Sequence, residues 1–187
     1  MRRVCVCLFL LCVPWLLLGG LVAESLSQEY SLMAAARYLD GAAMEWQEEK
    51  RCFACHTDYP YLIARAAVLG DLATHNRIRS TLEQRVEEPW VKEPGPYRNS
   101  EFVMVAAVLA HNDAATTGNV HPQTRKALER MWTVQSAHGG WIWPKGNKPP
   151  SGIDDHHGTA MARIAAGVAP GGYSRTPPAR AGLDKVR

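Results

Sequence analysis

The chain has 187 residues, 47% of them hydrophobic, and a formal net charge of +3. This length suits one domain with a modest core, and the composition excludes an intrinsically disordered chain. The nearly balanced charge, with no Lys/Arg cluster, excludes a nucleic-acid-binding surface, which needs a basic face.

The N-terminal segment has the three-part pattern of a secretory signal peptide. Two arginines precede an apolar run from Val4 to Leu18, and Ala23 supplies the small residue at a cleavage site. We therefore expect residues 1–23 to be a signal peptide and residues 24–187 to be the mature domain. An uncleaved membrane anchor is the alternative, but the apolar run is short for a membrane span.

Export determines the setting in which the mature protein works. Cleavage would remove two arginines and no acidic residue, which lowers the net charge from +3 to +1. We expect a periplasmic or otherwise extracytoplasmic protein, which meets a membrane only if the leader is retained. Three of the five cysteines lie in the leader, so only Cys52 and Cys55 remain in the mature chain.

The mature sequence predicts helices and no strands. No window shows a sustained alternation of apolar and polar residues, whereas apolar residues recur at three-four spacing in several segments. Short turns between these segments favour an all-α array of antiparallel helical hairpins. The predicted helices cover residues 28–46, 61–69, 74–86, a segment starting at 100, 122–135, 156–168 and a last segment from 177 onwards.

Residues 52–56, Cys-Phe-Ala-Cys-His, form a Cys-x-x-Cys-His run. This run is typical of c-type haem attachment, in which two thiols bond the porphyrin vinyl groups and the histidine binds the iron. We predict that Cys52 and Cys55 form thioethers with one haem c and that His56 is its metal ligand. Two readings stay open: a Cys52–Cys55 disulfide or dithiol, and a metal site. Zinc would need two further ligands at close spacing, and the sequence offers no such pair.

The sixth iron ligand is open, because methionine, histidine and an empty position each give a working haem. His156 and His157 are candidates at a predicted helix start. The methionine candidates are Met44, Met104, Met131 and Met161, although helical spacing assigns Met104 and Met131 to the core.

Several aromatic and acidic residues have two interpretations each. Asp154 and Asp155 would act as an acid and a base or would cap the helix that follows them. Five aromatic residues would line a haem edge or an apolar groove, or would pack in the core: Tyr59, Tyr61, Trp90, Trp141 and Trp143.

Two stretches carry a family resemblance. Residues 135–141, Gln-Ser-Ala-His-Gly-Gly-Trp, resemble the Q-x-x-D-G-x-W repeat motif of squalene–hopene cyclases and prenyltransferase-like α/α toroids. Residues 154–170 are similar to the inner helix that follows such a motif. The mature chain as a whole resembles a group of exported bacterial cyclase-like proteins with one Cys-x-x-Cys-His-Thr run. The likeness lies in residues 35–39, 52–62, 125–135 and 171–187.

The resemblance implies a partial α/α toroid, in which the Gln bonds backbone groups and the Trp packs on a helix end. Cyclases also have an acidic D-x-D-D-T-A motif that protonates a double bond, and Ile153–Ala160 does not match it. His138 stands where the repeat motif has Asp. These two departures from the cyclase motifs disfavour a degenerate cyclase.

The sequence thus predicts an exported haem-c-binding protein on a terpenoid-cyclase-like helical scaffold, with an electron-transfer or redox-sensing role and a redox protein partner. The first alternative is a non-enzymatic helical binding scaffold with a Cys52–Cys55 disulfide. The second is a degenerate squalene–hopene cyclase-like enzyme. A half toroid leaves an apolar face exposed, and a second copy of the chain would cover it, so a homodimer is part of the hypothesis.

Overall fold

A computed structural model describes residues 31–50, 57–68, 70–146 and 154–186. The chain divides into two units, Met1–Tyr38 and Leu39–Arg187. The first unit contributes only residues 31–38 to the described part, as the first turns of a helix. The second unit holds the core and the sites considered below.

The described residues are helical, and no strand occurs among them. This confirms the predicted all-α class. The elements are α2 (Leu32–Lys50), α3 (Asp58–Ala66), α4 (Ala73–Glu87), α5 (Pro96–Thr116), α6 (Pro122–Thr133), α7 (Asp155–Val168), the 3₁₀ helix η1 (Tyr173–Arg175) and α8 (Pro177–Asp184). Within the described ranges no helix combines the length and apolar character needed to cross a membrane.

Several helix ends differ from those predicted. α2 continues through the charged run to Lys50, because Glu and Lys are good helix formers and a charged face does not end a helix. The helix predicted to start at residue 100 begins earlier, since Pro96 takes the first helical position, where its missing N–H costs nothing. This helix, α5, ends at Thr116.

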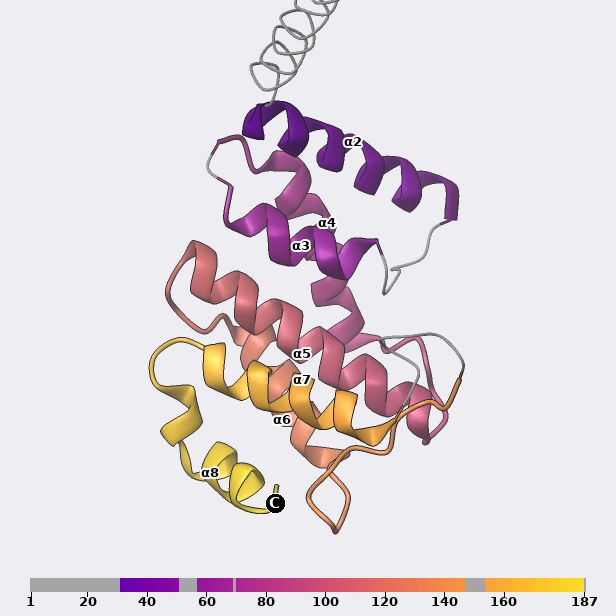
Figure 1. The fold of residues 1–187 in the computed structure, drawn as a ribbon, viewed down its shortest axis with the longest axis vertical. Helices are drawn as coiled ribbons and strands as arrows, with labels where there is room; N and C mark the ends of the chain where they lie inside the picture. The colour runs from indigo at the N-terminus through magenta and orange to yellow at the C-terminus, as the bar shows by residue number, and fades with distance from the viewer. Residues whose placement is uncertain (1–30, 51–56, 69, 147–153, 187) are drawn as a thin grey trace, which may run out of the picture. The chain divides into compact units, whose positions relative to one another are not determined.

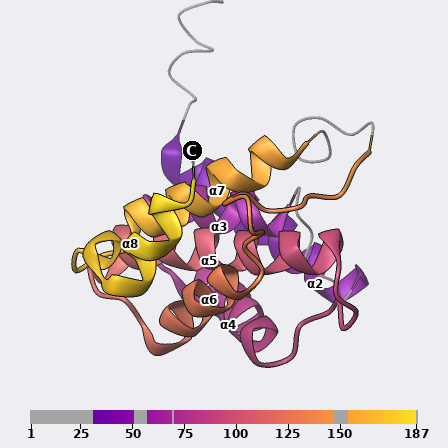
Figure 2. The same cartoon turned by 90° about the horizontal axis from the view of Figure 1, so that it is seen from below.

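Helix α5 lies at the centre of the second unit. Its residues from Val105 to Ala110 are all buried, which agrees with the predicted apolar character on nearly all its sides. α7 and α6 pack against it on different sides, and α3 and α4 also contact it (Figures 1 and 2).

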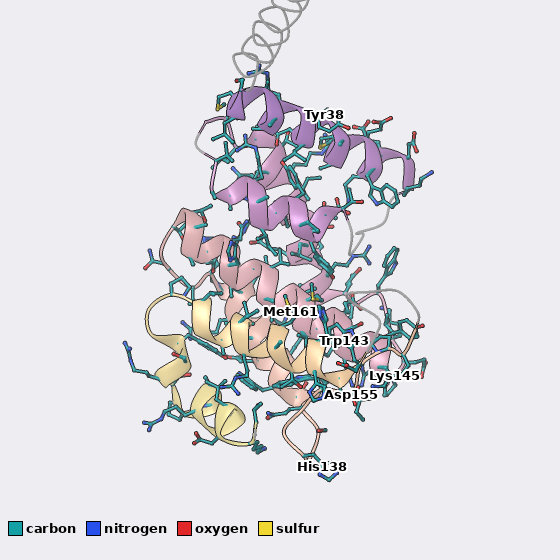
Figure 3. All side chains as sticks on the ribbon, in the orientation of Figure 1. Tyr38, His138, Trp143, Lys145, Asp155 and Met161 are labelled. Atoms are coloured by element: carbon teal, nitrogen blue, oxygen red, sulfur yellow. The ribbon has the colours of Figure 1, made fainter. Side chains whose placement is uncertain are left out.

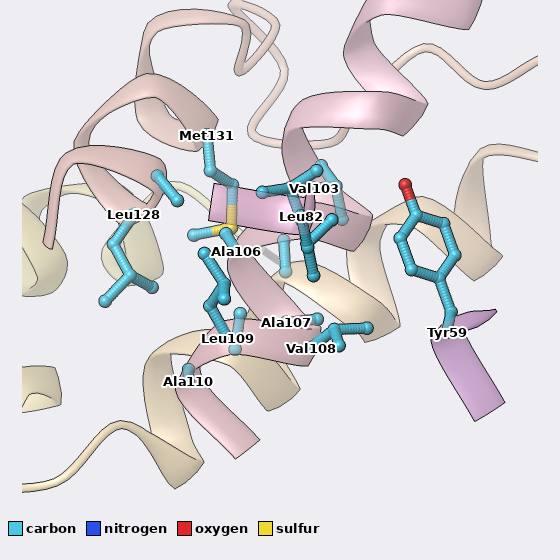
Figure 4. Close-up of a cluster of buried hydrophobic side chains, with 14 of the residues drawn as sticks. Tyr59, Leu82, Val103, Ala106, Ala107, Val108, Leu109, Ala110, Leu128 and Met131 are labelled. Carbon is cyan, nitrogen blue, oxygen red and sulfur yellow. The ribbon is translucent and has the colours of Figure 1, made fainter. Parts of the chain in front are cut away.

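The hydrophobic core surrounds α5. Leu82, Leu109, Leu128 and Met131 are fully buried there and come from three different helices (Figure 4). Small residues on α5 and α7 let these two helices approach closely. The alanines that share the core cluster are Ala106, Ala107, Ala110, Ala162, Ala165 and Ala166.

The C-terminal part of the second unit depends on glycine–tryptophan contacts. A Cβ atom on Gly158 would lie 2.3 Å from Cε3 of Trp143, and one on Gly182 would lie 2.4 Å from Cε3 of Trp132. Both distances are far below ordinary van der Waals contact. Glycine is therefore needed at these two positions so that α7 and α8 can rest against the indole rings.

Candidate functional site

The predicted haem-binding residues Cys52, Cys55 and His56 lie outside the described residues. The described chain stops at Lys50, the last residue of α2, and resumes at Thr57, just before α3. The described residues that flank this segment in the sequence are those at the end of α2 and the start of α3. The backbone N–H of Tyr61 donates to the carbonyl of Thr57 over 3.1 Å, so the helical bonding starts one residue after His56.

A buried ionic network joins α2 and α3 across this segment. Asp40 Oδ1 accepts hydrogen bonds from the hydroxyl of Tyr61 at 2.7 Å and from Nε of Arg65 at 2.9 Å. Nη2 of Arg65 also donates to Asp40 Oδ2, at 3.2 Å. Burial and the bond to Asp40 raise the pKa of Tyr61, so this hydroxyl remains a donor.

Arg65 has further partners at the end of α3. Its Nη1 donates to the carbonyl of Val68 at 2.8 Å, and its Nη2 donates to the carbonyl of Asp71. The side chain is only 2% exposed. A buried guanidinium is tolerated when its donors are satisfied, as they are here. One side chain therefore joins α2 to the end of α3 and to the turn that follows it.

An aromatic pocket of about 180 Å³ lies where α3, α4 and α5 meet the loop that follows α4. We call it the aromatic pocket and define it by its lining residues. They are Tyr59, Arg85, Trp90, Val91, Tyr97, Ser100 and Glu101.

The walls of the aromatic pocket are held in place from within. Glu101 accepts the backbone N–H groups of Trp90, at 2.8 Å, and of Val91, at 2.9 Å. The guanidinium carbon of Arg85 lies 4.2 Å from the centre of the Trp90 ring, a cation–π contact. Because both carboxylate oxygens of Glu101 accept hydrogen bonds from the loop, the backbone that bears the Trp90 ring is held in place.

The structure separates the five aromatic residues that the sequence grouped together. Tyr59 and Trp90 line the aromatic pocket, whereas Tyr61 belongs to the Asp40 network. Trp141 and Trp143 are buried and pack in the core. Sequence reasoning missed Arg85, Tyr97 and Glu101. The four-residue spacing of Tyr97 and Glu101 signals a shared helix face only once α5 is known to start at Pro96.

Gln135 and Trp141 tie the end of α6 to the C-terminal segment. Nε2 of Gln135 donates to the carbonyls of Gly139 and Gly182, both at 2.8 Å. Nε1 of Trp141 donates to the carbonyl of Met131 at 2.9 Å, and its ring is fully buried. These residues hold backbone groups and fill space, which is a structural role.

A second pocket, of about 310 Å³, brings together the two stretches that the sequence singled out. Its lining includes His138, Trp141, Asp155, His156 and Thr159. In Figure 3 His138 lies at the tip of its loop, and Trp143, Lys145 and Asp155 lie near one another at the start of α7. The lining mixes polar side chains such as Asp155 and Thr159 with the apolar ring of Trp141.

Asp155 acts in this pocket as a carboxylate. Its Oδ1 lies 2.6 Å from Nζ of Lys145 and accepts the backbone N–H of Trp143 at 2.8 Å. These bonds hold the pKa of Asp155 below its usual value. A proton-donating acid needs a raised pKa, so the environment of Asp155 argues against acid catalysis. Asp154 caps α7 by accepting the N–H groups of His156 and His157.

The structure places the candidate sixth ligands without choosing among them. Met131 is fully buried, while Met44, Met104 and Met161 are partly buried against the core. His156 is exposed, and the ring of His157 meets that of Trp143 edge-on at 5.3 Å. The sixth ligand stays a prediction. The described residues contain no group of three or more His, Cys, Asp or Glu able to bind a metal ion.

A second buried polar cluster, not anticipated from the sequence, joins α4 to α5. Nη1 of Arg79 donates to Oδ1 of Asn112 at 2.7 Å, and its Nη2 lies 2.7 Å from Oδ1 of Asp113. Nε2 of His75 lies 2.8 Å from Nδ2 of Asn112, which also donates to the carbonyl of Leu62. These side chains are hydrogen-bonded or ion-paired with one another, which indicates a structural cluster.

Close in sequence to the predicted haem segment, the structure thus shows an ionic network between α2 and α3 and an aromatic pocket partly lined by Tyr59 of α3. Comparison with protein-family models, with curated proteins and with solved structures gave no match for this chain.

Proposed function

We propose that the protein is an exported haem-c-binding protein with an electron-transfer or redox-sensing role. The observation that carries the proposal is the Cys52-x-x-Cys55-His56 run, which holds the only cysteines outside the leader. Cys52 and Cys55 would bond the haem, and His56 would bind its iron. The haem supplies reversible one-electron chemistry at the iron.

The surroundings of the run support this assignment. Asp40 in α2 and Arg65 in α3 fix the chain on both sides of it through a bond of 2.9 Å. Tyr59, four residues after Cys55, lines the aromatic pocket.

The scaffold proposed for this cofactor is a partial α/α toroid of antiparallel helical hairpins. Its support is the arrangement of the described helices around α5, together with the backbone bonds of Gln135 and the packing of Trp141. The open face of a half ring would be covered by a second copy, and the redox partner would be a protein. We place the protein in the periplasm on the basis of its leader.

Spectroscopy of the purified chain tests the proposal. The full chain is expressed in an exporting host that has the haem-attachment machinery. We expect a haem-staining band on a denaturing gel, the added mass of one haem, and a reduced spectrum typical of haem c. His56→Ala should abolish the low-spin spectrum, whereas Ile164→Ala, at an exposed site on α7, should leave it unchanged.

The competing readings give different results in the same samples. A Cys52–Cys55 disulfide gives a mass two hydrogens below that of the reduced chain and no haem, which would overturn the proposal. A degenerate cyclase would convert squalene, and we expect no product. The lowered pKa of Asp155 and the use of Asp154 as the cap of α7 argue against either carboxyl group as the acid.

A further inference from the structure

We propose that the aromatic pocket binds a small organic acid made of one aromatic ring and a carboxylate group. The carboxylate would pair with the guanidinium of Arg85, and the ring would pack against Trp90 and Tyr97. All three residues belong to the described part of the chain, and the site does not depend on the binding of haem. The charge, the exposed rings and the size of the pocket each favour such a ligand.

Arg85 gives the pocket a positive charge with no carboxylate partner among the described residues. Within that part of the chain its side chain makes no ion pair and no hydrogen bond. Its guanidinium carbon lies 4.2 Å from the centre of the Trp90 ring. This contact leaves the N–H groups available, and a guanidinium can hold a carboxylate through two parallel hydrogen bonds.

Two more guanidinium groups lie beside this wall of the pocket. The guanidinium carbons of Arg98 and Arg130 lie 5.9 and 5.8 Å from the centre of the Phe102 ring. Arg85 lines a small cavity of about 10 Å³ together with Phe102 and Arg130. Within the described chain neither Arg98 nor Arg130 makes an ion pair, and one buried nitrogen of each lacks a hydrogen-bond partner. An anion in the pocket would therefore lie near several unpaired positive charges.

Two carboxylates of this region are engaged by other groups. Among the described residues that line the pocket, Glu101 is the only acidic one, and its carboxylate accepts two backbone N–H groups of the loop. Glu87, at the end of α4, pairs with Lys126. Glu88 and Glu93 are exposed on the loop and do not line the pocket. The pocket therefore favours a ligand that brings its own negative charge.

The exposed rings of the pocket suit a ligand with an aromatic body. Trp90 is 53% exposed and Tyr97 is 67% exposed. Aromatic rings gain free energy when they pack offset or edge-to-face against another ring. A ligand ring at this position would also remove apolar surface of both side chains from water. Because Glu101 already holds the backbone of Trp90, little order has to be gained there on binding.

The pocket has room for a single ring. Its volume is about 180 Å³, and an engineered apolar cavity of about 150 Å³ binds benzene. Sites for drug-sized ligands are larger, about 300–1,000 Å³. The ligand class is therefore a one-ring acid such as phenylacetate, in which a short arm joins the ring to the carboxylate.

Isothermal titration calorimetry on the full chain tests the site. The probes are phenylacetate, its neutral analogue phenylacetamide, and acetate, which has the charge without the ring. The variants of the pocket are Arg85→Gln, Arg85→Lys and Tyr97→Ala. Arg180→Gln and Tyr38→Ala are the matched controls, because both side chains are exposed and neither lines the aromatic pocket. Far-UV circular dichroism checks that each variant is folded.

We expect phenylacetate to bind with a dissociation constant of about 1 mM or below. Phenylacetamide and acetate should each bind at least about tenfold more weakly. Arg85→Gln should weaken the binding of phenylacetate about tenfold, because the charge-assisted hydrogen bonds are lost. Arg85→Lys should recover part of that loss, since it keeps the charge without the fork. Tyr97→Ala should weaken binding about two- to tenfold, and the two controls should match the wild type.

Several results would overturn the inference. One is the absence of phenylacetate binding up to about 10 mM. Another is equal binding of phenylacetamide, or wild-type affinity in Arg85→Gln, since either would exclude the guanidinium as the anchor. Equal binding of acetate would show that the site does not recognise a ring.

The comparison among the three probes uses the wild-type chain, so it decides the matter even where a variant fails to fold. All probes are titrated into samples of the same haem content. The inference and the proposed function can therefore fail separately.

Discussion

The two ends of the second unit are held together by different kinds of contact. Around α3 and α4, buried charged and polar side chains hold the helices together: Arg65 bonds Asp40, His75 bonds Asn112, and Asp113 pairs with Arg79. Around α7 and α8, Gly158 and Gly182 rest against indole rings. The first end should respond to the loss of a partner or to pH, and the second to the addition of a single methyl group.

The largest expected effect is the loss of the Arg65 guanidinium. Arg65→Met would leave Asp40 without its partner and free the carbonyls of Val68 and Asp71. Removing one member of a buried ion pair costs about 3–5 kcal/mol. Urea unfolding followed by circular dichroism measures the free energy of unfolding.

An exposed ion pair provides the control for Arg65. Arg77 lies 3.9 Å from Glu48, and both side chains are about two-thirds exposed. Arg77→Met should change the free energy of unfolding by less than about 1 kcal/mol, because exposed pairs contribute little. Equal losses in the two variants would contradict the distinction between buried and exposed charge.

The next effect tests the glycine–tryptophan contact. In Gly158→Ala the new methyl would collide with the Trp143 ring, which is nearly buried and has little room to move. Overpacking of this kind costs about 1–3 kcal/mol. Thermal unfolding of the variant should show a lower midpoint temperature than the wild type.

Gly167→Ala in the same helix is the matched control. Nothing lies within 4 Å of a Cβ at Gly167. Alanine is a better helix former than glycine by about 1 kcal/mol, so this variant should be at least as stable as the wild type. Destabilisation of both variants would show that α7 tolerates no change, and that the Trp143 contact is not the cause.

A smaller effect is expected at the start of α7. Asp154 accepts backbone N–H groups from His156, at 2.9 Å, and from His157, at 3.3 Å. Asp154→Ala should cost about 1 kcal/mol, the usual loss for an N-cap. Asp184→Ala, at the exposed end of α8, should stay within about 0.5 kcal/mol of the wild type. The denaturation midpoint in urea distinguishes the two.

The last prediction is a difference in pH dependence. Burial lowers the pKa of His75, whose Nε2 faces the Asn112 amide as an acceptor. The unfolded chain therefore takes up a proton near pH 6.5 while the folded chain does not. It follows that the free energy of unfolding falls as the pH drops from 7 towards 5.

His75→Gln removes this titrating group and keeps an acceptor. We expect its free energy of unfolding to fall less between pH 7 and pH 5 than that of the wild type, as measured by urea unfolding at both values. Exposed His138 is the control, and His138→Gln should keep the wild-type pH dependence. An unchanged slope in His75→Gln would mean that His75 is not the group responsible.

Helical periodicity predicted the all-α class and an α-helix near each of α2 to α8, although α3 starts three residues before the predicted Tyr61 and the 3₁₀ helix η1 was not predicted. Their ends were less predictable, because Pro96 reads equally well as a loop residue and as the first residue of a helix. The charged run before Arg51 also resembled a break, although α2 continues through it to Lys50. At both places the local composition allows more than one helix end, so the sequence alone did not determine it.

The residues of the ionic network and the aromatic pocket were harder to predict from the sequence than the Cys-x-x-Cys-His run. The Cys-x-x-Cys-His spacing is local and can be recognised directly. By contrast, Asp40 and Arg65 are 25 residues apart, and Arg85 and Tyr97 meet Tyr59 only through the packing of three helices. No periodic pattern records such long-range partners.

The bond between Asp40 and Arg65 also has a consequence for conformational entropy. It closes a loop of about 25 residues that contains the Cys-x-x-Cys-His run. Loop-closure entropy is lost once, when the domain folds, and a longer loop adds only slowly to that loss. The two helices on either side of the Cys-x-x-Cys-His run are therefore tied to each other when the domain folds.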